Sequence, residues 1–431
     1  MMDVSFRYRR EQITLSAPDS ATVYRTSFPA PTGPAAGAVL DAVRAPLGSP
    51  PLAQALGSKR AGDVVVVVSD ITRPVPYARF LAELLAEIES AGVSADEILV
   101  LVATGMHRPS TPEERAEMFG EAAECCRVVD HRAEDDSGLV RIPGRSRAGS
   151  EIRLNRHFVE AGFRIITGLV EPHFMAGFSG GRKAVCPGLA SLQTVQDFHG
   201  YAFLSDERAS NGVLEGNPLH DEALSVARVA GVDFSLNVVL NSERELVRAF
   251  AGDLEAAHEA ACDFVRGAAC PPVAEPADAV VTSCGGYPLD ATLYQCVKGF
   301  VSCLPAVRAG GRMIAFGSCS EGIGSTEYAG IMRKWSGRWR EFLADISRAD
   351  VFTKDQWEFQ MHCRALEKVG QENLHFVTGG LGGDDLAHLS VNGHFAEAGG
   401  VRAELQSLLD EAAASGSVAL IPDGPYCAPL A

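Results

Sequence analysis

Continuous apolar runs closed by polar residues constrain the fold of this chain more than any other feature. The first run is Asp63-Val-Val-Val-Val-Val-Ser-Asp70, and residues 97–103 and 163–170 form two more. Such runs, rich in Val, Ile and Leu, are typical of strands that are buried on both faces of a parallel sheet. Helical patterns at about 76–91 and 111–120 lie between them. This alternation predicts an α/β fold in which helices cover a mainly parallel sheet.

A polar cluster follows each of the three runs. Asp70 and Arg73 close the first run, His107 follows the second, and His173 follows the third. Parallel strands of one sheet point the same way, so their carboxyl ends lie along one edge, where open α/β sheets bind ligands. We therefore expect these side chains to converge. Two simpler interpretations stay open: Asp70 and Arg73 form a local ion pair, and each histidine is structural.

The third run leads into the segment from Glu171 to Gly200, whose last part is expected to be a short helix at about 190–199. Gly180 and Gly181 tolerate positive φ, and successive backbone N–H groups there suit a phosphate or another anion. Lys183 supplies a point charge or a nucleophilic amine, and imidazoles serve proton transfer or metal binding. A structural turn is the alternative. The GxxxxGK[ST] spacing of a phosphate loop is absent, because Ala follows the lysine.

A second strand–helix region follows the Pro-rich segment 267–276, which we expect to be a linker. The sequence therefore predicts two domains, residues 1–268 and 277–431, each with a mainly parallel sheet covered by helices. Strands are expected at 279–283, 311–316, 374–378 and 418–421, and helices at about 290–305, 355–369 and 396–413.

Candidate ligand-binding residues in the second domain lie on two of these helices. Gln295 and Lys298 are three residues apart, hence on one helical face, and Tyr294 is adjacent. An ordinary exposed helical face is the alternative interpretation. For Trp357 the sequence context favours a packing residue over a ligand contact.

The amino-acid composition limits the kinds of partner that the chain can bind. The formal net charge is −17 and the pI about 5.1, which argues against nucleic acid and anionic membranes but not against a small anionic substrate. The first residues have no apolar signal region, and no apolar run approaches the roughly 18 residues of a membrane span. The eleven Cys have no CxxC pairs, so we expect reduced thiols in the cytoplasm.

Taken together, these motifs resemble the lactate racemase family, which uses a nickel-pincer nucleotide cofactor. Five matching segments occur in the expected order and span most of the chain. They are Asp70-Ile-Thr-Arg-Pro74, Ala103-Thr-Gly-Met-His-Arg-Pro109, Pro172-His through Lys183 to His199, Tyr294-Gln295 with Lys298, and Asp355-Gln-Trp357.

The resemblance implies a racemase or epimerase of a lactate-like 2-hydroxy acid with its active site in the interdomain cleft. The reaction would be reversible hydride transfer from the α-carbon to nickel pyridinium-3-thioamide-5-thiocarboxylic acid mononucleotide. Lys183 would carry this cofactor as a thioamide, His199 would bind nickel, and His107 and His173 would be the acid/base pair. The remaining roles implied are cofactor support by Asp70, Gly180 and Gly181, and substrate binding by Arg73, Tyr294, Gln295, Lys298 and Trp357.

Several alternatives stay open. Within the enzyme class they are a malate racemase and a C2 epimerase of a longer hydroxy acid such as an aldonate. A non-catalytic nickel-nucleotide carrier would need Lys183 and His199 but not two bases and a carboxylate clamp. A Schiff-base enzyme without metal would leave His199 unexplained. The expected partners are a small 2-hydroxy acid and the proteins that make and mature the cofactor.

Overall fold

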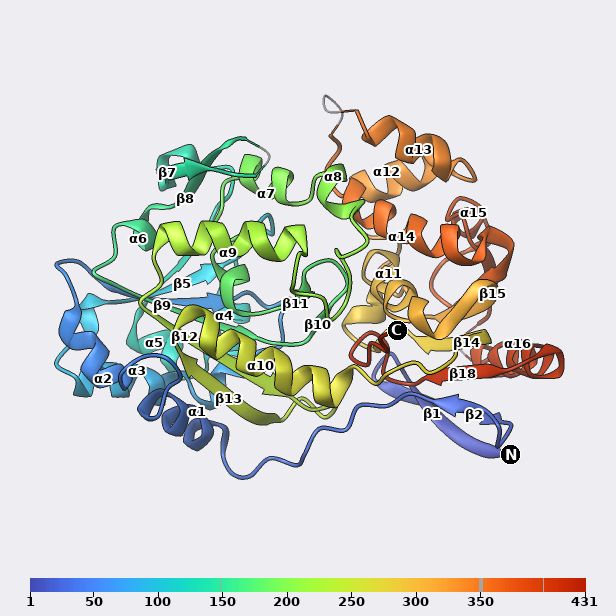
Figure 1. The fold of residues 1–431 in the computed structure, drawn as a ribbon, viewed down its shortest axis with the longest axis horizontal. Helices are drawn as coiled ribbons and strands as arrows, with labels where there is room; N and C mark the ends of the chain where they lie inside the picture. Colours follow the sequence, from blue (N-terminus) through green and yellow to red (C-terminus); the bar gives the residue numbers. More distant parts are fainter. Residues whose placement is uncertain (148, 349–351, 398) are drawn as a thin grey trace. The chain divides into compact units, whose positions relative to one another are not determined.

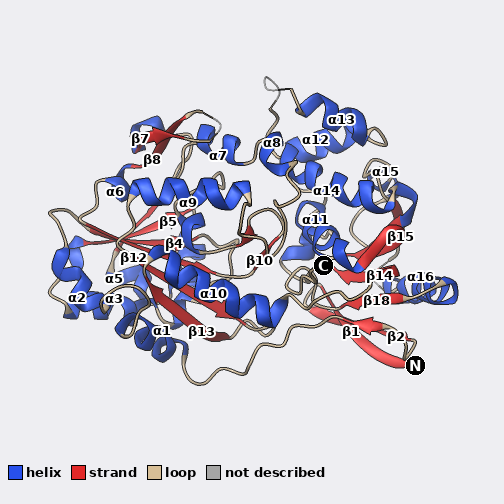
Figure 2. Cartoon of the chain, in the orientation of Figure 1, coloured by secondary structure: helices blue, strands red, loops and turns tan. Residues whose placement is uncertain are grey.

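The computed structural model describes residues 1–147, 149–348, 352–397 and 399–431. The chain forms two compact units, each built around a six-stranded sheet (Figures 1 and 2). The central unit comprises residues 28–199 and 213–265. The terminal unit comprises residues 1–27, 200–212 and 266–431.

The boundaries of these two units differ from the domain boundaries expected from the sequence. Residues 1–27 and 200–212 cluster with the C-terminal part of the chain, whereas we expected them in the first domain. The predicted linker at 267–276 begins too early, because the preceding helix α10 (Leu254–Ala269) continues through its first three residues. Division into domains 1–268 and 277–431 stays a prediction.

The sheet of the central unit has the strand order β13-β12-β9-β4-β5-β6. All neighbouring pairs are parallel except β12 with β13, which is an antiparallel edge pair. The strands are β4 (Val64–Ser69), β5 (Ile98–Ala103), β6 (Arg127–Asp130), β9 (Phe163–Leu169), β12 (Phe234–Leu240) and β13 (Leu246–Gly252). The three predicted strands β4, β5 and β9 are confirmed and lie side by side.

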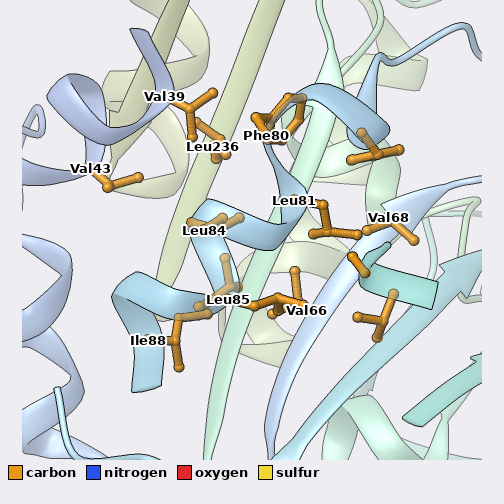
Figure 3. Packing of buried hydrophobic residues seen from close by; sticks show 14 of the residues in the cluster. Val39, Val43, Val66, Val68, Phe80, Leu81, Leu84, Leu85, Ile88 and Leu236 are labelled. Atoms are coloured by element: carbon orange, nitrogen blue, oxygen red, sulfur yellow. The ribbon is translucent and has the colours of Figure 1, made fainter. Parts of the chain in front are cut away.

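Apolar side chains of these strands pack against helices on one face of the sheet (Figure 3). Val66 and Val68 of β4 alternate with residues that point to the other face, as strand geometry requires. Leu81 and Leu84 of α3 (Leu81–Ser90), at helical spacing, pack on the same cluster. This core fixes β4 and therefore the position at which Asp70 leaves the sheet.

The other helices of the central unit connect the strands or cover the sheet. Helix α4 begins with a capping box in which Thr111 and Glu114 bond reciprocally, so the predicted helix start at Thr111 is confirmed. No element was predicted for residues 218–265, which form α9, β12, β13 and α10. The helices are α1 (Ala35–Arg44), α2 (Leu52–Ala55), α4 (Pro112–Phe119), α5 (Ala122–Cys125), α6 (Arg156–Val159), α7 (Leu192–Phe198) and α9 (Pro218–Ala230).

Two short hairpins complete the central unit. Strands β7 (Leu139–Arg145) and β8 (Glu151–Asn155) form an antiparallel pair. Strands β10 (Pro172–His173) and β11 (Gly177–Phe178) form a second pair directly after β9. This second hairpin turns the chain back, so that the glycine loop and Lys183 lie beside the strand end.

The sheet of the terminal unit has the order β17-β16-β15-β14-β18-β3, and every pair in it is parallel. The N-terminal hairpin of β1 (Met2–Tyr8) and β2 (Glu11–Ala17) shares an apolar core with α16 (Val401–Ser415) and the sheet. The strands are β3 (Thr22–Val23), β14 (Ala277–Ser283), β15 (Val307–Phe316), β16 (Leu374–Thr378), β17 (Asn392–Phe395) and β18 (Val418–Ile421).

Helices α11 (Leu293–Ser302) and α14 (Gln356–Val369) pack against each other and against this sheet. Phe300 of α11 contacts Phe376 of β16 edge to face. The remaining helices of the unit are α8 (Tyr201–Leu204), α12 (Thr326–Trp335), α13 (Trp339–Ile346) and α15 (Gly383–Leu386). Within the described residues, no helix combines the length and apolarity needed to cross a membrane.

Candidate functional site

Asp70 and His107 form a hydrogen-bonded pair at the ends of β4 and β5. His107 Nδ1 lies 2.6 Å from Asp70 Oδ2, and Thr72 donates to Asp70 Oδ1. Burial raises the pKa of Asp70, but His107, Thr72 and Arg73 together outweigh it, so the pKa lies below its ordinary value. A carboxylate only accepts, so the His107 Nδ1 carries hydrogen and, in the neutral ring, Nε2 has the lone pair. The exposed ring can present that lone pair to a ligand.

Arg73 lies in the turn that follows Asp70. Its backbone N–H donates to the Asp70 carbonyl, and its guanidinium lies 3.9 Å from Glu171 Oε1. The ion pair of Arg73 is thus formed with Glu171, a residue that the sequence did not suggest, rather than with Asp70. At about one third exposed, the Arg73 side chain remains accessible.

His173 is buried on the β10–β11 hairpin. Its Nδ1 accepts hydrogen bonds from the backbone N–H groups of Met175 and Ala176 at 3.2 and 3.3 Å. Its Nε2 lies 2.9 Å from Lys183 Nζ. The hairpin brings His173 and Lys183, ten residues apart in sequence, into direct contact.

The glycine loop is shaped by close packing. Gly180 and Gly181 have φ of 74° and 51°, and a Cβ on Gly181 would meet the His258 ring at 2.6 Å. The Gly181 N–H donates to Asn237 Oδ1. The expectation that the N–H groups of this loop are open to an anion is therefore wrong at Gly181, because a side chain from β12 already occupies its N–H.

The buried side chain of Arg182 holds this loop in place through hydrogen bonds. It is 1% exposed, and its guanidinium donates to the carbonyls of Ala176 and Phe178 at 2.7 and 2.9 Å. It also lies 2.9 Å from Nε2 of His258, a fully buried ring whose pKa burial drives well below its ordinary value. Neither Arg182 nor His258 carried a sequence signal for this role, because the contact between the loop and α10 joins residues far apart in sequence.

His199 ends helix α7. Its Nδ1 lies 2.9 Å from the Val195 carbonyl, which only accepts, so Nδ1 carries the hydrogen and Nε2 has the lone pair. Burial, partly opposed by this hydrogen bond, lowers the pKa of His199 to about 3. A neutral imidazole whose other nitrogen is bonded to a carbonyl is the usual form of a metal-binding histidine. No group of three or more His, Cys, Asp or Glu suited to a metal occurs among the described residues.

The candidate residues of the terminal unit lie on α11 and α14. Trp357 is 4% exposed, and its indole N–H donates to the Tyr294 hydroxyl at 2.9 Å. Glu358, which the sequence did not suggest, is also buried; burial raises its pKa far above its ordinary value, while Lys298 acts in the opposite direction. Oε1 of Gln295 and Oε1 of Glu358 are buried without a hydrogen-bond partner.

The structure therefore gathers the predicted residues into two groups, one in each unit. The central unit holds Asp70, Arg73, His107, His173, Gly180, Gly181, Lys183 and His199, and the terminal unit holds Tyr294, Gln295, Lys298 and Trp357. Direct contacts join Asp70 to His107 and His173 to Lys183 in the central unit, and Tyr294 to Trp357 in the terminal unit.

Sequence comparison identifies two family models in the chain. The lactate racemase N-terminal domain matches residues 8–212, and the lactate racemase C-terminal domain matches residues 273–425. Lactate racemase from Thermoanaerobacterium thermosaccharolyticum is 38% identical over 330 residues, covering 72% of this chain and 74% of the relative. Lactate racemase from Lactiplantibacillus plantarum is 35% identical over 390 residues, covering 88% of this chain and 87% of the relative.

Solved structures show the same fold. The lactate racemase apoprotein from Thermoanaerobacterium thermosaccharolyticum has a TM-score of 0.87 at 31% identity, covering 100% of this chain and 99% of that one. A protein from Thermotoga maritima has a TM-score of 0.65 at 18% identity, covering 87% of this chain and 96% of that one, and supports the fold alone.

Proposed function

Because this chain belongs to the lactate racemase family, a family of isomerases, we propose that it interconverts the enantiomers of lactate or of a closely related 2-hydroxy acid. The observation that carries the proposal is the pair of histidines at one edge of the central sheet, where His107 follows β5 and His173 follows β9, the two strands on either side of β4. Nε2 of His107 has a lone pair that can take a proton, and Nε2 of His173 lies 2.9 Å from Lys183 Nζ.

The two histidines supply the proton chemistry. The α-proton of a 2-hydroxy acid is weakly acidic, whereas its hydroxyl proton moves readily once a hydride leaves the α-carbon. His107 takes that proton at Nε2, and Asp70 stabilises the imidazolium that forms. His173 serves the opposite enantiomer, so each ring takes the hydroxyl proton of one enantiomer and returns it to the other. One complete inversion therefore needs both rings.

The charged side chains hold the substrate. Arg73 presents a planar fork that matches a carboxylate, and Gln295 and Lys298 are proposed to complete the clamp from α11. A 2-keto acid forms when hydride and proton have left, and it must shift before it is reduced on its other face. The clamp keeps the keto acid from escaping during that shift. The prediction that both groups of residues meet in an interdomain cleft stays a prediction.

The residues in the central unit fit a nickel-pincer nucleotide. His199 is neutral, with Nδ1 bonded to a carbonyl, so Nε2 is the nitrogen that suits nickel. The described residues offer no cluster of three or more metal-binding side chains, which agrees with a cofactor that brings most of its own ligands. When bound, this cofactor would accept the hydride and return it. Lys183 is the proposed attachment site, and Gly180 and Gly181 let the chain pass close to the cofactor.

Other substrates of the same chemistry remain candidates within this proposal. Malate and aldonates share the 2-hydroxy carboxylate that the two histidines and the clamp would bind, and they differ only beyond the α-carbon. A carrier of the cofactor would not need two proton-transferring rings. Proteins that make and mature the cofactor are the proposed partners.

A substrate screen tests the proposal. Protein produced in a host that makes the cofactor is incubated with single enantiomers of lactate, malate and an aldonate, and the products are separated by chiral chromatography. We expect inversion of lactate or of another member of the panel, and a mass adduct on the peptide that contains Lys183. Loaded protein that inverts none of them would contradict the proposed activity.

A further inference from the structure

Two histidines of the terminal unit face each other on its sheet. His375 lies on β16 and His394 on the neighbouring edge strand β17, and His394 contacts α16 through its other ring nitrogen. His375 Nδ1 and His394 Nε2 are 2.9 Å apart. The His394 side chain is 20% exposed and His375 is partly buried, so water can reach the pair.

Glu404 of α16 determines which nitrogen of His394 carries the hydrogen. Its Oε1 lies 2.7 Å from His394 Nδ1, and a carboxylate only accepts. Nδ1 therefore carries the hydrogen, and in the neutral ring Nε2 has the lone pair. A carboxylate on the far nitrogen is a usual support of a metal-binding histidine, because it fixes the ring and makes the other nitrogen more basic.

Asn392 does the same for His375. Its amide nitrogen donates to the Glu372 carbonyl at 3.1 Å, which fixes the orientation of the amide. The same nitrogen lies 3.4 Å from His375 Nδ1, so its second hydrogen is available to the lone pair there. Burial, His394 and Arg312 lower the pKa of His375 to about 4, so this ring is neutral at neutral pH.

The lone pairs of His375 Nδ1 and His394 Nε2 therefore face each other across the gap of 2.9 Å. Two lone pairs repel each other, so a positive species between them would stabilise the arrangement. A proton and a metal ion are the two candidates. They compete for the same nitrogens, because a metal binds only the deprotonated ring nitrogen.

We propose that His375 Nδ1 and His394 Nε2 form a binding site for a divalent transition-metal ion, with water completing its coordination. Bonds of about 2.1 Å from both nitrogens, across a gap of 2.9 Å, meet at nearly a right angle. That angle fits the tetragonal or octahedral coordination of Cu²⁺ and Ni²⁺. Tetrahedral Zn²⁺ would hold the nitrogens about 3.4 Å apart.

The charges around the pair agree with a cation. Arg312 of β15 opposes binding by its own charge, but its guanidinium lies 3.7 Å from Glu411 of α16, and Glu404 adds a second carboxylate. The site has only two protein ligands, in keeping with the absence of larger His, Cys, Asp or Glu clusters among the described residues. It lies in the terminal unit, whereas His199 belongs to the central unit.

Crystals of the full-length protein soaked in Ni²⁺ test the site without any variant. At about pH 8 an ordinary histidine is neutral, so the proton competes little. We expect an anomalous difference peak at the nickel absorption edge between the His375 and His394 rings. A soaked crystal without a peak there would overturn the inference and leave a shared proton as the bridge.

Equilibrium dialysis of the cofactor-free protein against Ni²⁺ counts the bound ions in solution. His375→Ala and His394→Ala should each lower the number of bound ions by one per chain. The matched control is His388→Ala, an exposed histidine of the same unit, which should leave the number unchanged. An unchanged number in both His375→Ala and His394→Ala would overturn the inference.

The support from Glu404 has its own test. Glu404→Gln keeps the size of the side chain but removes the charge, and it should weaken Ni²⁺ binding about 10- to 100-fold. Unchanged affinity in this variant would overturn the assignment of His394 Nε2 as a ligand. All three measurements use protein without cofactor or substrate, so their outcome is independent of the proposed racemase activity.

Discussion

The two groups of candidate residues are held in place in different ways. In the central unit, hydrogen bonds to backbone groups hold them. His173 accepts hydrogen bonds from two backbone N–H groups, and His199 donates one to a backbone carbonyl. Arg182 donates hydrogen bonds to two backbone carbonyls of the loop. In the terminal unit, Trp357 and Tyr294 bond each other through side chains. Buried oxygens of Gln295 and Glu358 there have no hydrogen-bond partner.

This difference indicates which side chains the fold positions most rigidly. Backbone groups at a sheet edge or in a tight loop cannot move without moving the fold, so the central group is set before any ligand binds. Side chains on two packed helices can adjust individually. We therefore expect changes in the central group to affect chemistry and stability strongly, and changes in the terminal group to affect affinity or pH response.

The largest effect should follow loss of either acid/base histidine. His107→Ala and His173→Ala should each reduce racemisation about 10²- to 10⁴-fold in both directions, because one inversion needs both rings. Gln295→Ala, on α11, should mainly raise KM. Chiral chromatography of loaded enzymes measures these rates, and in D₂O the product should retain its α-hydrogen. A single histidine variant that racemises at the wild-type rate would remove that ring from the mechanism.

The second-largest difference between the two groups should be in the stability of their variants. Arg182→Met removes the guanidinium that satisfies the carbonyls of Ala176 and Phe178 and should lower the free energy of unfolding by about 3–5 kcal/mol. Gln295→Leu removes an oxygen that already lacks a partner and should cost about 1 kcal/mol or less. Thermal unfolding of the two variants checks the difference. Equal losses would show that the loop is not held by Arg182.

A smaller effect should follow Arg73→Lys, which replaces a planar fork by a point charge. We expect a loss of about 1–3 kcal/mol in transition-state binding, roughly 5- to 150-fold in kcat/KM, since one charge-assisted hydrogen bond is lost. Arg79→Lys, a nearby arginine on the 3₁₀ turn Tyr77–Arg79, is the matched control and should leave kcat/KM unchanged. Unchanged kcat/KM in Arg73→Lys would place Arg73 outside the site.

The smallest effect concerns Glu358 and depends on pH. Burial raises its pKa, so the folded chain keeps this proton to higher pH than the unfolded chain, and stability falls as pH rises above about 4.5, the ordinary value. Glu358→Gln mimics the protonated form. It should leave the melting temperature unchanged at pH 4.5 and raise stability by about 1–2 kcal/mol at pH 8. A variant that is less stable than wild type at pH 8 would show that Glu358 is needed as a carboxylate, paired with Lys298.

Local patterns allowed much of the fold to be predicted. The apolar runs that became β4, β5 and β9 have a period and composition that fit only strands buried on both faces. The helical pattern at about 111–120 likewise placed the start of α4 correctly. Residues 218–265 and the position of residues 1–27 were not predicted, because pairing of β12 with β9 and of β3 with β18 joins segments far apart in sequence.

The sequence by itself determined the strand ends, and with them the place of Asp70, His107 and His173, because parallel strands share one carboxyl edge. It also determined the residue types that can transfer protons, form a covalent bond or bind a metal. Only the tertiary structure decided the partners: Glu171 for Arg73, His258 for Arg182, and Lys183 for His173. Hydrogen-bond direction depends on atoms that meet only after the loop folds back, so the protonated nitrogen of each histidine is a property of the fold.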